Sequence, residues 1–202
     1  MGSRPTNALL PKASRPGLLA SLLGVSLFLV ATLFTIGHST RDLEDFFRVL
    51  QAHSIESVVD VRAFPLSRRY PHFNRESLER TLMAENIRYL WVKELGGRRR
   101  RAPQPSLNLG LRSLSFRNYA DHMLTAEFEE GIAVLLGAGE KSRTAYMCAE
   151  RLYFRCHRML ISDWLVAHGH EVLHVDDSGP TTAHRVTSEA QMIGNLLLYP
   201  AP

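Results

Sequence analysis

The stretch LFTIGHSTRDLEDFFRVL, residues 33–50, passes from a short apolar run directly into a helical pattern. Leu33–Ile36 has the length and composition of a buried strand. Behind it, apolar residues recur at the spacing of one helix face, at Leu43, Phe46, Phe47 and Leu50. Ser39 and Asp42 predict a capping box where that helix begins. A strand followed at once by an amphipathic helix is the repeating unit of α/β folds.

The same alternation continues through the rest of the chain. Further strands are predicted at Ser57–Val61, Tyr89–Val92, Thr144–Met147 and Glu171–Val175. Helical patterns separate them, the second capped by Asn74, the fourth ended by Gly137 and the last, 157–167, closed by Gly169. The sequence therefore predicts an α/β fold: a three-layer single domain, Rossmann-like, with a mostly parallel sheet of about five strands flanked by helices.

Composition limits the size and class of the protein. The 202 residues are 45% hydrophobic and 22% charged, which suits one globular domain and argues against a disordered chain. We place this domain at residues 33–202 and an N-terminal extension at 1–32. The net charge of +4 favours an anionic partner, either a small ligand or nucleic acid. No feature predicts a specific protein partner.

The N-terminal extension has two interpretations. Residues 18–36 carry no charge and are long enough to span a bilayer, which would anchor the protein in a membrane. The last four of these residues are, however, also the predicted first strand. We therefore favour a cytoplasmic protein whose natural start is Val30, an alternative initiation codon.

Polar or flexible groups follow the ends of four predicted strands. The carboxyl ends of parallel strands meet at one sheet edge, where ligands bind in α/β folds. We expect a shared site there from His38, Ser39, Asp60, Arg62, Gly96, Gly97, Cys148 and Glu150.

The two cysteines fall on either side of one loop. Cys148 ends a strand, and the loop after it leads to a helix that begins near Cys156-His157-Arg158. Backbone N–H groups at a helix start favour an anion and lower a thiol pKa. The arrangement resembles that of rhodaneses and cysteine phosphatases, although Phe154 occupies the position of their loop arginine.

These residues lead to an enzymatic hypothesis. Cys148 is the candidate nucleophile, and Arg158 and Arg62 hold the negative charge of a nucleotide-like or phosphorylated substrate. His38 or His157 acts as acid or base, oriented by Glu150.

The segment after the second predicted strand is a further candidate for substrate binding. Its basic and aromatic residues suit a phosphate group and a stacked base; they are Arg62, Ser67, Arg68, His72 and Phe73. The arginine run 98–101 lies in a long loop, 96–115, and is expected to steer anions electrostatically.

Two alternatives remain open. The same basic edge would serve a non-catalytic nucleotide or nucleic-acid binding module. Alternatively, Cys148, Cys156 and His157, with His38 or His72, could hold a divalent metal, although a cysteine spacing of eight is not a standard zinc spacing. No cofactor is firmly implied.

A set of ordered motifs carries a family resemblance. They are TIGHST at 35–40, DVR at 60–62 with FP at 64–65, SRR at 67–69, PHFNR at 71–75, LGG at 95–97, FRNYA at 116–120, CAE at 148–150 and CHR at 156–158. Together they resemble domain-of-unknown-function family 488 over about 35–199, His184 included. The resemblance implies a three-layer α/β fold and a bacterial-type cytosolic protein, but no activity. The chain departs from the family at Tyr153, where a proline is common.

Overall fold

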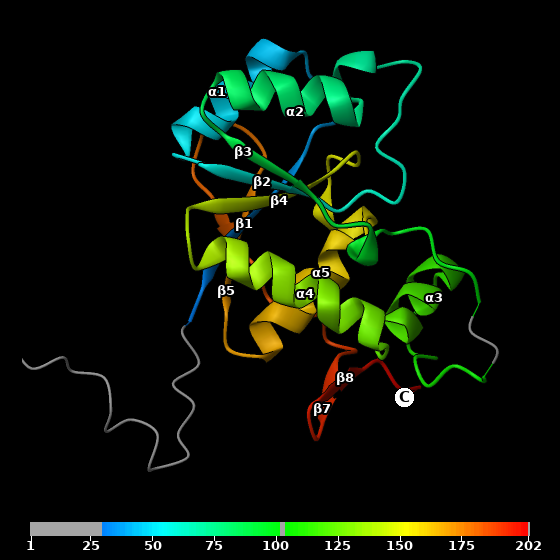
Figure 1. The fold of residues 1–202 in the computed structure, drawn as a ribbon. Coiled ribbons are helices and arrows are strands. Elements are labelled where there is room, and N and C mark those ends of the chain that lie inside the picture. The colour runs from blue at the N-terminus through cyan, green and yellow to red at the C-terminus, as the bar shows by residue number, and fades with distance from the viewer. Residues whose placement is uncertain (1–29, 102–103, 202) are drawn as a thin grey trace, which may run out of the picture.

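A computed structural model describes residues 30–101 and 104–201 (Figure 1). Its main sheet contains β1 (Thr32–Gly37), β2 (Ser57–Asp60), β3 (Arg88–Trp91), β4 (Thr144–Cys148), β5 (Glu171–Val175) and β6 (Thr182–Ala183). The strand order is β3-β2-β4-β1-β5-β6, and only β6 pairs in the antiparallel direction.

Helices cover both faces of this sheet, as Figure 1 shows. On one face lie α1 (Leu43–Ala52) and α2 (Arg75–Ala84), and on the other lie α3 (Leu114–His122), α4 (Ala126–Gly139) and α5 (Arg158–Ala167). Because strand side chains alternate between faces, Leu33 packs toward α4 and α5 and Phe34 packs toward α1. The predicted three-layer α/β fold is confirmed.

The five long strands fall where the apolar runs predict them, with ends shifted by at most one residue. The strand order places β4 between β2 and β1, whereas β1 adjoins β2 in the usual dinucleotide-binding order. The prediction of a Rossmann-like fold therefore holds for the layered architecture and not for the strand order.

The helix ends show three corrections. Asn74 stands at the N-cap position of α2, but its side chain makes no capping hydrogen bond and accepts from the Ser67 N–H instead. Asp42 alone caps α1, its carboxylate accepting from the Asp45 N–H at 2.8 Å, whereas Ser39 lies in a left-handed turn with φ of 53°. The predicted capping box is therefore wrong. Helix α4 continues through Gly137 to Gly139, because its apolar face still packs on the core at Ala138. Gly169, at φ of 87°, follows α5 as predicted.

The C-terminal segment closes over the α5 face of the sheet. It forms the hairpin of β7 (Gln191–Ile193) and β8 (Leu196–Leu198), which the sequence did not predict, and ends in the buried Tyr199. The Tyr199 hydroxyl donates to Asp163, a fully buried carboxylate of α5 that also accepts hydrogen bonds from His184 and Thr187. This network fixes the segment to the domain.

The anchor and start-site predictions fall mainly on residues 1–29, which lie outside the described part of the chain. Across residues 30–101 and 104–201, no helix combines the length and apolar character that a membrane crossing needs.

Candidate functional site

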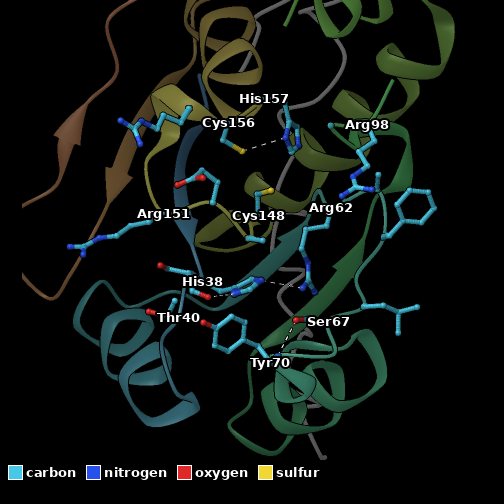
Figure 2. Close-up of a pocket in the computed structure, with 18 of the residues that line it drawn as sticks. His38, Thr40, Arg62, Ser67, Tyr70, Arg98, Cys148, Arg151, Cys156 and His157 are labelled. Carbon is cyan, nitrogen blue, oxygen red and sulfur yellow. Dashed lines mark hydrogen bonds between the residues drawn. The ribbon is translucent and has the colours of Figure 1, made fainter. Parts of the chain in front are cut away.

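An open cavity of about 800 Å³ lies at the carboxyl ends of β1 and β4 (Figure 2). Its wall includes both cysteines, His38 and His157. The charged residues in its lining are five arginines, Arg62, Arg69, Arg98, Arg151 and Arg155, against one carboxylate, Glu150. Asp60 and Asp176, which lie outside the lining, pair with Arg62 and Arg151. Within the described residues, the other three arginines have no carboxylate within 4.0 Å, so the cavity is suited to an anion.

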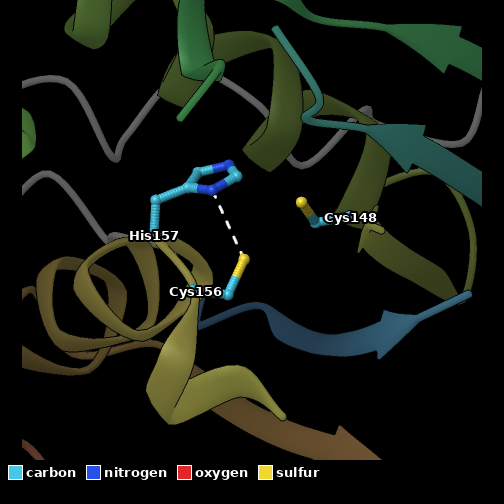
Figure 3. A group of neighbouring side chains, drawn as sticks. All are labelled: Cys148, Cys156 and His157. Atoms are coloured by element: carbon cyan, nitrogen blue, oxygen red, sulfur yellow. Dashed lines mark hydrogen bonds between the residues drawn. The ribbon is translucent and has the colours of Figure 1, made fainter. Parts of the chain in front are cut away.

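Cys156 and His157 form a hydrogen-bonded pair in this cavity (Figure 3). The sulfur of Cys156 lies 3.3 Å from Nδ1 of His157. On the other side of the ring, Nε2 lies 2.9 Å from the carbonyl oxygen of Val61, which can only accept. Nε2 therefore carries a proton, and Nδ1 is the ring atom that exchanges a proton with the thiol. A thiol, an imidazole and a carbonyl group that orients the imidazole are thus brought together.

Two neighbours hold the His157 ring in place. Tyr119, from the FRNYA motif, is fully buried beside it with ring centroids 5.1 Å apart, and its hydroxyl donates to the Leu95 carbonyl. On the other side, a Cβ on Gly97 would lie 2.3 Å from Nδ1. Glycine at this position therefore allows the backbone to approach the ring closely. Gly96 packs against the backbone of Ala63 and does not line the cavity.

Cys148 lies next to this pair, and its sulfur is within 4.8 Å of the Cys156 sulfur and of a ring nitrogen of His157. The two thiols differ in acidity. The neighbouring Cys148 thiol, together with the charge and N–H groups of Arg158, outweighs burial and lowers the pKa of Cys156 to about 6. Its proximity to Cys156, together with burial, raises the pKa of Cys148. The sequence assigned the thiolate to Cys148, whereas the geometry favours Cys156.

Arg158 holds the loop between the two cysteines, residues 149–155, by hydrogen bonds to its backbone. The side chain is 1% exposed and does not line the cavity. Its guanidinium donates to Thr35 Oγ1 on β1 and to the carbonyls of Glu150 and Arg151 in the loop. No carboxylate of the described residues lies within 4.0 Å of it, and its positive charge is one of the causes that lower the pKa of the Cys156 thiol. Arg158 is therefore a positioning residue.

Arg62 is held in place by buried partners. The carboxylate of the fully buried Asp60 accepts hydrogen bonds from the backbone N–H, Nε and Nη2 of Arg62. It also accepts from the Tyr89 hydroxyl. Nη2 also donates to the Phe73 carbonyl, and Nη1 donates to Nε2 of His38. These bonds leave one Nη1 proton for a ligand in the cavity. Asp60 is outside the lining and anchors Arg62.

His38 is held in its neutral form. Burial and the nearby Arg62 charge lower its pKa to about 3. Nδ1 donates to the Ser39 carbonyl, and Nε2 accepts from Arg62. Both ring nitrogens are therefore occupied, and His38 orients Arg62.

The other predicted residues divide between the lining and its support. Ser39, Ser67 and Glu150 line the cavity, and Glu150 accepts from the Leu152 N–H without contacting either histidine. Phe73 is fully buried and stacks on His38 at 4.1 Å, so its ring is closed to a ligand. His72 bonds the Arg41 carbonyl, and Arg68 is exposed outside the lining.

Several lining residues were not among the predicted site residues, namely Thr40, Ala63, Phe64, Leu66, Arg69, Tyr70, Arg98, Ser115, Phe116, Ala149, Arg151 and Arg155. Phe64 and Phe116 lie in the quoted motifs, and Arg151 and Arg155 lie between the cysteines, which is the signal that could have identified them.

The proposed metal ligands are partly brought together. Cys148, Cys156 and His157 form a three-ligand group of the donor types that zinc binds, and the Val61 carbonyl would orient the histidine. The suggested fourth ligands, His38 and His72, are bonded to Arg62 and to the Arg41 carbonyl instead.

The comparisons with known proteins agree with the motif-based resemblance. The family model "Domain of unknown function DUF488" matches residues 42–165, well over half of the chain. This range contains both cysteines and all five arginines that line the cavity. No curated protein and no solved structure matches the chain. The protein belongs to the DUF488 family.

Proposed function

We propose that the protein is a cysteine-dependent enzyme that acts on a small anionic substrate, phosphorylated or nucleotide-like, with Cys156 as its nucleophile. The observation that carries the proposal is the Cys156–His157 pair in the wall of a cavity lined by five arginines. A thiol that is paired with an oriented imidazole and lies beside a buried guanidinium is activated as a nucleophile.

The reaction follows from the positions of the protons. The Cys156 sulfur would bond the electrophilic atom of the substrate while the bond to the leaving group breaks, and Nδ1 of His157 would give its proton to that group. Water would then cleave the covalent intermediate, with Nδ1 taking a proton from it. Nε2 would stay bonded to Val61 throughout, so the ring keeps its orientation.

The cavity rim supports an anion with a planar group. Arg69 lies over the Tyr70 ring and Arg98 over the Phe64 ring, at 5.4 and 6.0 Å. Within the described residues neither arginine has a carboxylate within 4.0 Å, and Phe64 is 67% exposed. Free guanidinium edges beside an open aromatic face suit a phosphate joined to a base. The same surface would also suit a nucleic-acid strand.

Alkylation with charged and neutral reagents tests the proposal. Relative to a free model thiol, Cys156 should prefer iodoacetate over iodoacetamide by at least about tenfold, because the arginines concentrate anions in the cavity. Millimolar phosphate or a nucleoside monophosphate should protect it. Arg69→Ala and Arg98→Ala should reduce the preference, and the exposed, remote Arg80→Ala serves as matched control.

The outcomes separate the proposal from its alternatives. Absence of any iodoacetate preference would contradict an anion site. Protection by a single-stranded oligonucleotide alone, weakening steeply with salt, would instead indicate a nucleic-acid binding module.

A further inference from the structure

Cys148 takes no part in the proposed reaction, although it lines the same cavity. Its sulfur lies within 4.8 Å of the Cys156 sulfur and of a His157 ring nitrogen, as Figure 3 shows for the three side chains. The described structure thus contains two free thiols side by side, one of them 3.3 Å from Nδ1 of His157. This is the arrangement from which a disulfide forms by way of an oxidised sulfur.

The connection between the two cysteines allows their sulfurs to meet. Cys148 ends β4, and Cys156 follows the short 3₁₀ turn η4 (Tyr153–Arg155). The loop between them faces solvent at residues 149–151 and 154–155, so core packing does not fix those side chains. Sulfurs within 4.8 Å need only a side-chain rotation and a small loop shift to reach bonding distance.

We infer that Cys148 is a resolving thiol that closes a reversible disulfide with Cys156 after a hydroperoxide has oxidised Cys156. The inference rests on the proposed thiolate at Cys156. In the first step the Cys156 thiolate attacks the distal peroxide oxygen, the O–O bond breaks, and His157 protonates the departing alkoxide or hydroxide. Cys156 is then a sulfenic acid, oxidised by two electrons, and the peroxide has become an alcohol or water.

In the second step the Cys148 sulfur attacks the Cys156 sulfur. The S–O bond breaks, the Cys148 proton passes to Nδ1 of His157, and Nδ1 hands this proton on to the leaving hydroxide to form water. Two thiols and one hydroperoxide thus give one disulfide, one alcohol and one water. Cys148 suits this role because its sulfur lies within 4.8 Å of the Cys156 sulfur and of a His157 ring nitrogen, which can take its proton.

The disulfide would protect the site and inactivate it at the same time. A sulfenic acid left alone is oxidised further to sulfinic acid, which thiols do not reverse. A disulfide between adjacent thiols is restored by a dithiol reductant. The anionic substrate would compete with the peroxide, because both must reach the same sulfur.

Oxidation of the full chain, followed by intact-mass and peptide mass spectrometry, tests the inference. With a roughly equimolar amount of hydrogen peroxide at pH 7, the wild type should lose about 2 Da, with a Cys148–Cys156 crosslink that dithiothreitol removes. Cys148→Ser should instead give a dimedone-trappable sulfenic acid at Cys156 and form sulfinic acid at least about tenfold faster than the wild type. Cys156→Ser should leave Cys148 unmodified.

The controls distinguish failure of this inference from failure of the proposed function. If Cys156 prefers iodoacetate but the wild type forms sulfinic acid as fast as Cys148→Ser, Cys148 is no resolving thiol and the nucleophile proposal stands. If Cys156 reacts with neither iodoacetate nor peroxide, both proposals are contradicted. If the purified protein carries one equivalent of zinc or iron and resists oxidation until a chelator is added, the thiols are metal ligands, and both proposals again fall.

Discussion

Replacing Arg158 by methionine is expected to lower the free energy of unfolding by about 3 kcal/mol at pH 7. The substitution keeps much of the side-chain volume but removes the hydrogen bonds to Thr35 and to the carbonyls of Glu150 and Arg151. It also removes the buried positive charge beside Cys156, so the thiolate loses a stabilising partner. Urea denaturation of the full chain measures the effect.

A double-mutant cycle isolates the charge interaction. Cys156→Ser alone should cost about 2 kcal/mol, because it leaves the Arg158 charge buried without an anion. If the two side chains are coupled, the double variant should lose at least about 1 kcal/mol less than the two single losses combined. Arg158→Lys, which keeps the charge, should fall between the wild type and Arg158→Met. Additivity within about 0.5 kcal/mol would show that no ion pair exists.

Lowering the pH from 7 to 5 is expected to remove about 4 kcal/mol of stability through two histidines. Burial and Arg62 lower the pKa of His38 to about 3, and burial, His184 and Arg158 lower that of His174 to about 3. In the unfolded chain both keep the ordinary value of 6.5. Below pH 6.5 the two histidines are therefore protonated in the unfolded state but remain neutral in the folded state. Stability is fully present above that pH and falls until about pH 3.

Denaturation at pH 7, 6 and 5 checks this expectation. Nδ1 of His174 is buried without a hydrogen-bond partner, so no carboxylate of the described structure is placed to accept its proton. His38→Asn and His174→Asn should each remove about half of the acid-induced loss. A free energy of unfolding that stays constant from pH 7 to pH 5 would show that these rings are protonated in the folded protein.

The layered fold is predictable because it depends on local patterns. The five long strands are short apolar runs, and each strand-to-helix step carries its own periodicity or cap, as in β1 and α1. The hairpin of β7 and β8 escaped prediction because its exposed residues, such as Met192 and Ile193, show no strand alternation. Its position depends on the distant partner Asn108, which accepts from the Tyr199 N–H.

The candidate site was predictable as a location more than as a set of roles. Strand ends placed Cys148, Arg62 and His38 at one edge, and the cavity lies there. The choice between the two thiols depends on tertiary contacts, since the Val61 carbonyl that orients His157 is 96 residues away along the chain. Likewise, the position of Phe73 in a basic segment predicted an exposed ring that could stack on a base. In the structure, α1 and His38 bury this ring.

The measurement that tests the central claim most directly is the alkylation rate of each cysteine against pH, read by peptide mass spectrometry with and without a chelator. Cys156 should react with a midpoint near its lowered pKa of about 6, while Cys148 stays slow at neutral pH. The chelator should change neither rate. If Cys148 instead reacted first, or both thiols stayed inert up to the ordinary thiol pKa of about 8.5, the Cys156 thiolate would be contradicted.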